Sequence, residues 1–285
     1  MKEGRHKELL DSIKESCHDD LTRLLDLASE KGASSWLTSL PLADYGFHLN
    51  KQHFIDAIYM RYDIPIRDAP RTCSCGEPYS VNHCLTCKTG GYVILRHNVV
   101  RDASKTLLDE VCKDVRTEPA LLPVTGEELP TGANKQDGAR ADISALGFWL
   151  PLSRAFFDVK VVNPLALTNR RMEVQAMYKH HENDKKRMYN ERIIQIEKGS
   201  FTPLIFSCTG GTGVEATKFI KELASKTSSK RAEDYSQTVS FIRRKLRFDI
   251  LRTCVISLRG ERKSRKSRAI EVEEMDIGLC NLNEF

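Results

Sequence analysis

The chain has 285 residues, of which 29% are charged and 40% hydrophobic, and a formal net charge of +5 at pH 7. This length can bury a full hydrophobic core in one large domain or two small ones, and the charge permits nucleic-acid binding without requiring it. No apolar run approaches the ~18 residues that span a bilayer, and the charged N-terminus lacks the apolar stretch of a secretory signal. We therefore expect no membrane partner and an intracellular location, in the nucleus rather than the cytoplasm.

Cysteine and basic residues are distributed unevenly along the chain. The nine cysteines are an odd number and cluster in part, which favours a reducing compartment with a metal site over a disulfide framework. The stretch 226–268 holds fourteen Lys or Arg residues against four Asp or Glu residues. Such a segment either adds salt-sensitive affinity for a nucleic-acid backbone or is only a soluble, disordered end.

The first part of the chain predicts helices around a cysteine-rich loop. The spacing of leucines predicts a helix over residues 5–31, and a second helix is expected over 50–62 with its apolar face in the core. Residues 63–72 contain two prolines and predict a loop, which leads into the cysteine cluster at 73–87. A third helix is expected over 98–115.

The second part of the chain predicts alternating strands and helices. Residues 119–139 are rich in Pro, Gly and Asn and predict a loop with one short strand at 121–124. The elements expected after it are strands at 140–147 and 155–163, a charged helix over 170–196, a buried strand at 203–207, helices over 214–226 and 233–248, and an apolar segment at 251–258. Strands placed between helices predict an α/β (α+β) fold.

The cysteine cluster predicts a structural zinc site. Cys73, Cys75, His83 and Cys87 follow the pattern C-x-C-x7-H-x3-C. Zinc prefers four tetrahedral thiolate or imidazole ligands, and a closed set of protein ligands is typical of a structural site. A short segment can fold around such an ion without a core of its own. Cys84 is a competing ligand that could replace His83 or Cys87, and a coincidental group of free thiols is the alternative to any metal site.

A second pattern places acidic residues and a lysine in apolar strands. Asp158 and Lys160 lie two residues apart in a strand, so they face the same side, ~7 Å apart along the chain. Asp142 precedes Asp158 by fifteen intervening residues, and a hairpin would bring the two aspartates together. Paired carboxylates suit Mg²⁺ or Mn²⁺, and Lys160 would then orient water or stabilise phosphate charge. The alternative is an Asp–Lys ion pair on a solvated sheet face.

The sequence offers no unique helical acid to complete this set. Asp102, Asp109 and Glu110 all fall on the helix before the strands, and helical phase singles out none of them. Asp102 or Glu110 is the candidate for completing the metal shell.

Three further features of the second half have competing interpretations. Lys185 and Arg192 share a helix face that contacts phosphate or is simply solvated. His180 and His181 are neighbours on a helix and should point in different directions, which argues against a metal site between them. The run Gly210–Gly213 before a helix could bind phosphate, but it lacks the Lys-Ser/Thr of a P-loop, so a structural turn is favoured.

Several stretches occur in a specific order and spacing. They are residues 30–41 (EKGASSWLTSLP), the cluster from Cys73 to Gly91, Arg96-His97-Asn98 with Asp102, residues 123–126 (PVTG), Asp137 to Asp142, Phe157 to Pro164, and residues 199–207 (GSFTPLIFS) with Gly210-Gly211. In these stretches the chain resembles the restriction-like endonuclease region of non-LTR retrotransposon proteins. It is more closely similar to stand-alone or reverse-transcriptase-derived open reading frames of many invertebrate genomes.

The resemblance spans about residues 30–260 and implies a zinc knuckle packed against a PD-(D/E)xK nuclease core, with a mixed sheet flanked by helices. In that family Asp142 matches the first aspartate, and Asp158 and Lys160 match the D-x-K motif. Arg96 and His97, with Asp102, match a segment on the first helix of the core, and we expect Arg96, His97, Lys185 and Arg192 to contact nucleic acid.

The chain departs from the family at three points. Cys84 stands where relatives carry a small apolar residue, and many relatives carry Arg where this chain has Lys160. No Tyr-x-Asp-Asp polymerase motif is present, so the chain has no reverse transcriptase of its own.

The expected organisation is a helical segment at 1–70, a zinc knuckle at 71–95, a nuclease-like core at 96–260 and a disordered charged tail at 261–285. The expected activity is metal-dependent hydrolysis of DNA phosphodiester bonds, with structural Zn²⁺ and catalytic Mg²⁺ or Mn²⁺, although RNA is not distinguished from DNA. The alternatives are a catalytically inactive nucleic-acid-binding remnant of a retrotransposon protein and a zinc-dependent protein-interaction module.

Overall fold

Four strands form one mixed sheet in the order β1-β2-β3-β4. The computed structural model describes residues 2–260, and side chains from residue 8 onward. The strands are β1 (Lys113–Thr117), β2 (Ile143–Leu146), β3 (Arg154–Val162) and β4 (Ser200–Ser207). The first three pair antiparallel, and β4 pairs parallel to β3. The hairpin between β2 and β3 is therefore the one that the sequence predicts.

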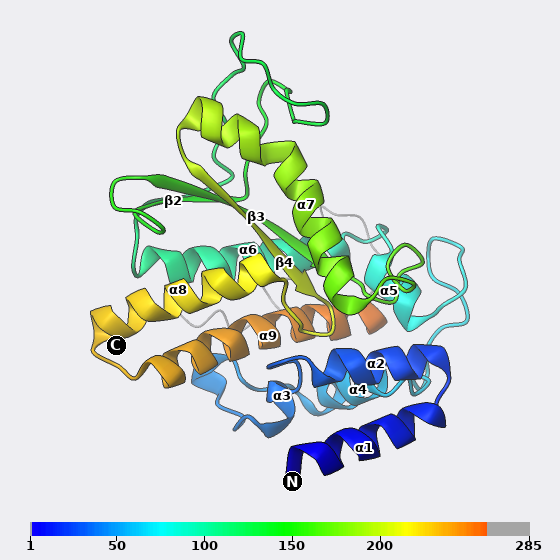
Figure 1. The fold of residues 1–285 in the computed structure, drawn as a ribbon. Coiled ribbons are helices and arrows are strands. Elements are labelled where there is room, and N and C mark those ends of the chain that lie inside the picture. The colour runs from blue at the N-terminus through cyan, green and yellow to red at the C-terminus, as the bar shows by residue number, and fades with distance from the viewer. Residues whose placement is uncertain (1, 261–285) are drawn as a thin grey trace.

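Helices cover both faces of the sheet (Figure 1). One face is covered by α6 (Tyr92–Asp109) and α8 (Val214–Arg231), and α9 (Tyr235–Arg259) packs against both of these helices. The other face is covered by α7 (Val174–Arg192), which connects β3 to β4 and ends in a π-helical turn at Ile193–Glu197. A parallel strand pair needs a crossover connection of this kind.

The side chains of β3 alternate between these two layers. Phe157 and Val159 join the main hydrophobic cluster with residues of α6, α8 and α9. Phe156 packs in a separate cluster with Tyr189 and Ile193 at the end of α7. Because successive side chains of a strand point to opposite faces, Asp158 and Lys160 belong to the layer of α7.

The N-terminal part of the chain packs on the far side of α9 (Figure 1). Its elements are α1 (Lys2–Glu15), α2 (Asp19–Ser29), α3 (Ser35–Thr38), a 3-10 turn (Ala43–Tyr45), α4 (Lys51–Arg61) and α5 (Val81–Thr86). The main hydrophobic cluster includes Trp36, Ala57 and Leu85 from this part together with residues of the sheet. A continuous core thus crosses residues 70 and 95, the boundaries expected from the sequence.

Helix α9 is buried on nearly all sides in its second half, although it carries charged residues there. Asp249 is fully enclosed and lies 3.4 Å from both Lys245 Nζ and Arg252 Nη1. Arg252 also donates to the backbone carbonyl of Gly46 at 2.8 Å. Charged groups are tolerated inside a protein when they are paired and hydrogen-bonded in this way.

The structure confirms a mixed α/β fold and corrects several predicted elements. The helix predicted over 5–31 is divided between α1 and α2, because the His18 side chain accepts from the Leu21 N–H and begins a new helix. The helix predicted over 98–115 begins at Tyr92 and ends at Asp109. The two segments predicted at 233–248 and 251–258 are one helix, α9.

Several short elements were not predicted, among them β1 and α5. Strand β1 was assigned to the preceding helix, and α5 lies inside the cysteine cluster. The short strand expected at 121–124 is not formed, and only an isolated bridge joins Ala120 to Arg140 nearby. The expected disordered tail at 261–285 lies outside the described residues.

Candidate functional site

Asp142 lies beside Asp158 at the point where β2 begins. The Asp142 backbone N–H donates to the Phe157 carbonyl at 3.1 Å, and its Oδ2 accepts from the Val159 N–H at 2.6 Å. The Asp142 carboxylate therefore takes the place of the backbone carbonyl that would continue the β2–β3 pairing. It lies against the segment that contains Asp158. The hairpin brings the two aspartates together, as expected from the sequence.

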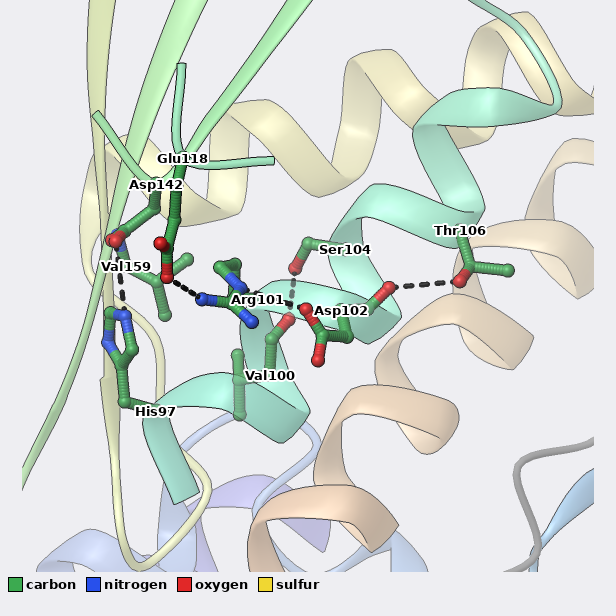
Figure 2. A network of polar contacts seen from close by, with 9 residues as sticks. All are labelled: His97, Val100, Arg101, Asp102, Ser104, Thr106, Glu118, Asp142 and Val159. Carbon is green, nitrogen blue, oxygen red and sulfur yellow. Dashed lines mark hydrogen bonds and ion pairs between the residues drawn. The ribbon is translucent and has the colours of Figure 1, made fainter. Parts of the chain in front are cut away.

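His97 approaches Asp142 from helix α6 (Figure 2). Its Nε2 lies 3.1 Å from Asp142 Oδ1. The hydrogen bond that Asp142 accepts from His97 raises the pKa of His97 above its usual value, against the effect of burial, and the charge of Asp158 raises it further. His97 thus holds the Asp142 carboxylate in place, and its pKa responds to the charges of both aspartates.

Asp158 is only 4% exposed and is paired with helix α7. Lys185 Nζ lies 2.6 Å from Asp158 Oδ2. Burial raises the pKa of the Asp158 carboxyl, Lys185 lowers it, and the charge of Asp142 raises it. The charge of Asp142 thus acts on the Asp158 carboxyl, and Lys185 supplies the cation that compensates Asp158.

Lys160 faces α7, on the same side as Asp158, as the strand period predicts. Its Nζ lies 3.0 Å from His181 Nδ1, one helical turn before Lys185. Burial and the charge of Lys185 lower the pKa of Lys160. Burial, together with Lys160, lowers the pKa of His181 to about 4, so the imidazole is neutral at pH 7 and accepts a hydrogen bond from the lysine.

A row of polar groups continues from His181 to the loop that follows β3. His181 Nε2 lies 3.1 Å from Asn169 Oδ1, and Asn169 Nδ2 donates to the Asn163 carbonyl at 2.8 Å. Because His181 Nδ1 accepts from Lys160, Nε2 carries the ring proton and donates it to Asn169 Oδ1. The position of the Lys160 ammonium is therefore fixed from outside the site, by residues that the sequence analysis did not connect with it.

Glu118 is an acid near Asp142 that the sequence analysis missed. Its backbone N–H donates to the Asp142 carbonyl at 2.8 Å, and its side chain is 2.5 Å from Arg101 Nη1. Figure 2 shows the side chains of Glu118 and Asp142 next to each other. Glu118 follows β1, a strand that was not predicted, with φ at +48°, so no periodic signal marked it.

The two helical acids expected to complete the site lie elsewhere. Asp102 accepts from Arg101 Nε at 2.8 Å and is half-exposed. Glu110 pairs with Arg231 Nη2 at 2.7 Å on helix α8. Glu110 is thirteen residues beyond His97, which places it ~20 Å further along the helix axis. The structure brings neither side chain into contact with Asp142 or Asp158.

Two of the four expected nucleic-acid contacts are interior residues instead. Arg96 is 2% exposed, and its Nη2 donates to the Leu85 carbonyl at 2.7 Å. Arg192 is fully buried, and it donates to the carbonyls of Asn134 at 2.7 Å, Gln136 at 3.0 Å and Leu122 at 2.8 Å. Arg96 therefore joins α5 to α6, and Arg192 fixes the long loop before β2.

The cysteine cluster forms a compact group of four ligands. Cys73, Cys75, His83 and Cys87 each offer one ligand atom, and these atoms all lie within 4.8 Å of one another. Cys75 Sγ is 3.2 Å from His83 Nε2, and Cys73 Sγ is 3.9 Å from Cys87 Sγ. A three-cysteine, one-histidine set is compatible with zinc.

Local backbone geometry explains how fifteen residues build this group. Gly76, with φ at +93°, closes a tight turn in which its N–H donates to the Cys73 carbonyl at 2.9 Å. Ser80 caps α5 by accepting from the His83 N–H at 3.0 Å, and this short helix carries His83 to the site. Cys84, the competing ligand, is 1% exposed and belongs to the main hydrophobic cluster instead.

His180 and His181 do not point apart as expected. Their rings meet edge to face, with centroids 5.2 Å apart, and their ligand atoms lie within 4.8 Å of each other and of Asp184. His181 already has a partner on each nitrogen, Lys160 and Asn169. We therefore infer that His181 holds Lys160 in position and that this group does not bind a metal.

The glycine run before α8 is a structural turn. The Glu215 N–H, at the start of α8, donates to Glu182 Oε1 at 2.9 Å, so a carboxylate of the protein occupies the helix N-terminus. A Cβ on Gly211 would collide with Glu30 Oε2, and one on Gly210 would collide with the Arg247 guanidinium. Glycine is needed here because other side chains pack directly on the backbone.

No protein-family model and no curated protein sequence matches this chain. Within residues 2–260, no helix combines the length and apolar character that crossing a bilayer demands.

Proposed function

We propose that the protein is a metal-dependent endonuclease of the PD-(D/E)xK type that hydrolyses DNA phosphodiester bonds. The observation that carries this proposal is the juxtaposition of Asp142 and Asp158 on neighbouring strands, with Lys160 on the same side of β3 as Asp158. This is the spacing and order of the D…D-x-K motif that the sequence resembles.

The two aspartates fit a hard divalent cation. Mg²⁺ and Mn²⁺ prefer carboxylate oxygens and retain waters that bridge to substrate phosphate. Asp158 is buried with a second carboxylate beside it, and it is compensated by the Lys185 ammonium. When bound, the metal would act as a Lewis acid and lower the pKa of a bound water. Glu118, next to Asp142, is a better placed third carboxylate than Asp102 or Glu110.

The remaining residues of the site have distinct roles in this proposal. His97 holds Asp142 in orientation by bonding Oδ1, while the Val159 N–H holds Oδ2. Lys160 stabilises the charge that develops on the phosphate, because its ammonium is held at a fixed place by His181. Lys185 compensates Asp158 before the cation binds and contacts phosphate afterwards.

The Cys/His group is proposed to hold a structural zinc ion. Arg96 joins the carbonyl of Leu85, in the zinc-binding segment, to α6, and His97 is the next residue of that helix. Zinc binding would therefore fix the start of the helix that positions His97 on Asp142. This supports a structural role for zinc at a distance from the chemistry.

The test is nicking of supercoiled plasmid by the zinc-loaded protein in Mg²⁺ or Mn²⁺, with a labelled RNA of the same sequence as a second substrate. Asp158→Asn should lose cleavage by at least about a hundredfold, the scale of one transition-state charge contact, and still bind DNA. Glu110→Gln is the matched control and should cleave as the parent does. Cleavage of RNA alone would reassign the substrate, and cleavage by Asp158→Asn would overturn the site.

A nucleic-acid-binding remnant is the second candidate. It is favoured by one observation, that Asp102 and Glu110 do not contact Asp142 or Asp158 and so leave the expected helical acid unfilled. A remnant would bind DNA with an affinity that falls steeply with salt. It would give no cleavage with either metal, in the parent or in any variant.

A further inference from the structure

A small internal cavity lies where four helices meet. It has a volume of about 20 Å³ and is lined by residues of α2, α3, α4 and α9, with Thr209 from the turn after β4. Most of the lining is apolar, and three side chains that carry N–H donors, Trp36, Arg61 and Arg247, complete it. The volume suits a single atom or one water molecule.

The three donors share one property. Trp36 Nε1, Arg61 Nε and Arg247 Nε are all buried, and none has a hydrogen-bond partner among residues 2–260. Trp36 and Arg247 are 4% and 5% exposed. Buried N–H groups in folded proteins are nearly always bonded, and leaving one unbonded costs ~1–3 kcal/mol. Three residues with such a group line one cavity, and this favours an occupant that accepts hydrogen bonds.

The charge around the cavity is positive, and no ion pair within residues 2–260 neutralises it. Burial, with the nearby Arg61 charge, lowers the pKa of Arg247 to about 10. Within the described chain, neither guanidinium has a carboxylate at ion-pair distance. Glu30, the acid whose charge interacts with Arg247, bonds to the Tyr178 hydroxyl at 3.1 Å instead.

Water does not fit this lining well. A water molecule donates two hydrogen bonds as well as accepting them, and Trp and Arg side chains offer donors alone. The Thr209 hydroxyl, the other polar side chain of the lining, is bonded to Ser207 at 2.9 Å and is the one side-chain acceptor that the lining offers to a water. An occupant that only accepts hydrogen bonds and carries negative charge satisfies the donors and the charge together.

We propose that this cavity is a binding site for one small inorganic anion of halide size, chloride in solution, held by Trp36, Arg61 and Arg247. The anion joins α3, α4 and α9, so it fastens the N-terminal helices to the core. This site is separate from the carboxylates and does not depend on the nuclease proposal. The protein should therefore be stabilised by chloride itself rather than by ionic strength.

The test is thermal unfolding of the full chain while gluconate is replaced by chloride at constant ionic strength. The parent should gain stability along a saturable curve, because a ligand that binds only the folded state stabilises it by mass action. Trp36→Phe keeps the ring and removes one donor, so its apparent chloride affinity should fall about tenfold. Arg247→Met should lose the response, and Arg243→Met on the same helix should keep it.

A crystal grown in bromide gives an independent measurement. An anomalous bromide peak between Trp36 and Arg247 is expected in the parent and in Arg243→Met. A parent that shows no saturable chloride response, or the same response in Trp36→Phe as in the parent, would overturn the proposal. So would a parent crystal in which the cavity holds water and no anomalous scatterer.

Discussion

The cysteine-rich segment and the carboxylate site are built in opposite ways. The four ligands of the Cys/His group come from fifteen consecutive residues and are brought together by one turn and one short helix. The carboxylate site draws His97, Asp142, Asp158 and Lys185 from four elements spread over almost ninety residues. The first needs only local backbone geometry, whereas the second exists only when the whole sheet and two helices have assembled.

The difference determines what each site does to the protein around it. A local ligand set has no core of its own, so its metal supplies most of the free energy that keeps it folded. The residues of the carboxylate site are held by contacts between the sheet, α6 and α7, whether or not a cation is bound. Removal of metal should therefore unfold the first site, and in the second it should disturb only the start of α6, which carries His97.

The largest expected effect comes from removing a ligand of the Cys/His group. Cys87→Ser should lose the bound zinc and unfold the segment, because structural zinc contributes ~10 kcal/mol or more of apparent binding free energy. Zinc content and limited proteolysis between residues 71 and 91 measure this. Cys84→Ala is the control and should keep a full equivalent of zinc, and its loss of zinc would mean that Cys84 is a ligand.

A smaller effect is expected at the fully buried Arg192. Arg192→Met removes hydrogen bonds to three backbone carbonyls of the loop before β2. The free energy of unfolding should fall by at least ~3 kcal/mol, since each bond to a charged donor contributes ~1.5–3 kcal/mol. Urea unfolding measures the loss. Arg187→Met, on the exposed side of α7, should change stability by less than ~0.5 kcal/mol, and equal losses in both would contradict this account.

The smallest effect is the pH dependence of the contact between His97 and Asp142. The pKa of His97 is raised in the folded protein, so its contribution to stability is complete below the unfolded value near 6.5 and is lost as pH rises through the folded value. His97→Gln should remove this contribution, at most ~1 kcal/mol. Urea unfolding from pH 5.5 to 8.5 measures the difference.

His53→Gln is the matched control for this measurement. Burial lowers the pKa of His53, so the contribution of His53 to stability depends on pH in the opposite way. It is lost as pH falls below about 6.5, and this loss should be absent from His53→Gln. If the stabilities of the parent and of His97→Gln differ by the same amount at all pH values, Asp142 does not raise the pKa of His97.

Sequence patterns were sufficient to predict the arrangement of residues that lie close together in the chain. Strand alternation placed Asp158 and Lys160 on one side, and metal-ligand spacing identified the Cys/His set. The same reasoning failed for α9, because Asp249 and its neighbours were taken as the end of a helix. Their charges are paired inside the core, and no pattern in one segment shows a partner that is provided by tertiary packing.

The partners of the site residues could not be predicted for the same reason. Lys185 was expected to contact nucleic acid. Its position opposite Asp158 depends on how α7 packs on β3, which the sequence does not show. Glu118 follows a strand of which every residue but Val115 is exposed, so it carries no hydrophobic signal. Arg96 was expected to contact nucleic acid from the family resemblance, and Arg192 from the helix face that it shares with Lys185. Only the fold shows which backbone carbonyls these arginines satisfy.

The central place of α9 also sets an order of events during synthesis. The chain leaves the ribosome from its N-terminus and begins to fold as it does so, and α9 emerges after every other described element. Until then, α3 to α6 lack the helix on which they pack, and Asp56, fully buried, lacks the Arg259 side chain that lies 2.5 Å from it. A nascent chain should thus close its cysteine-rich segment around metal well before the carboxylate site exists.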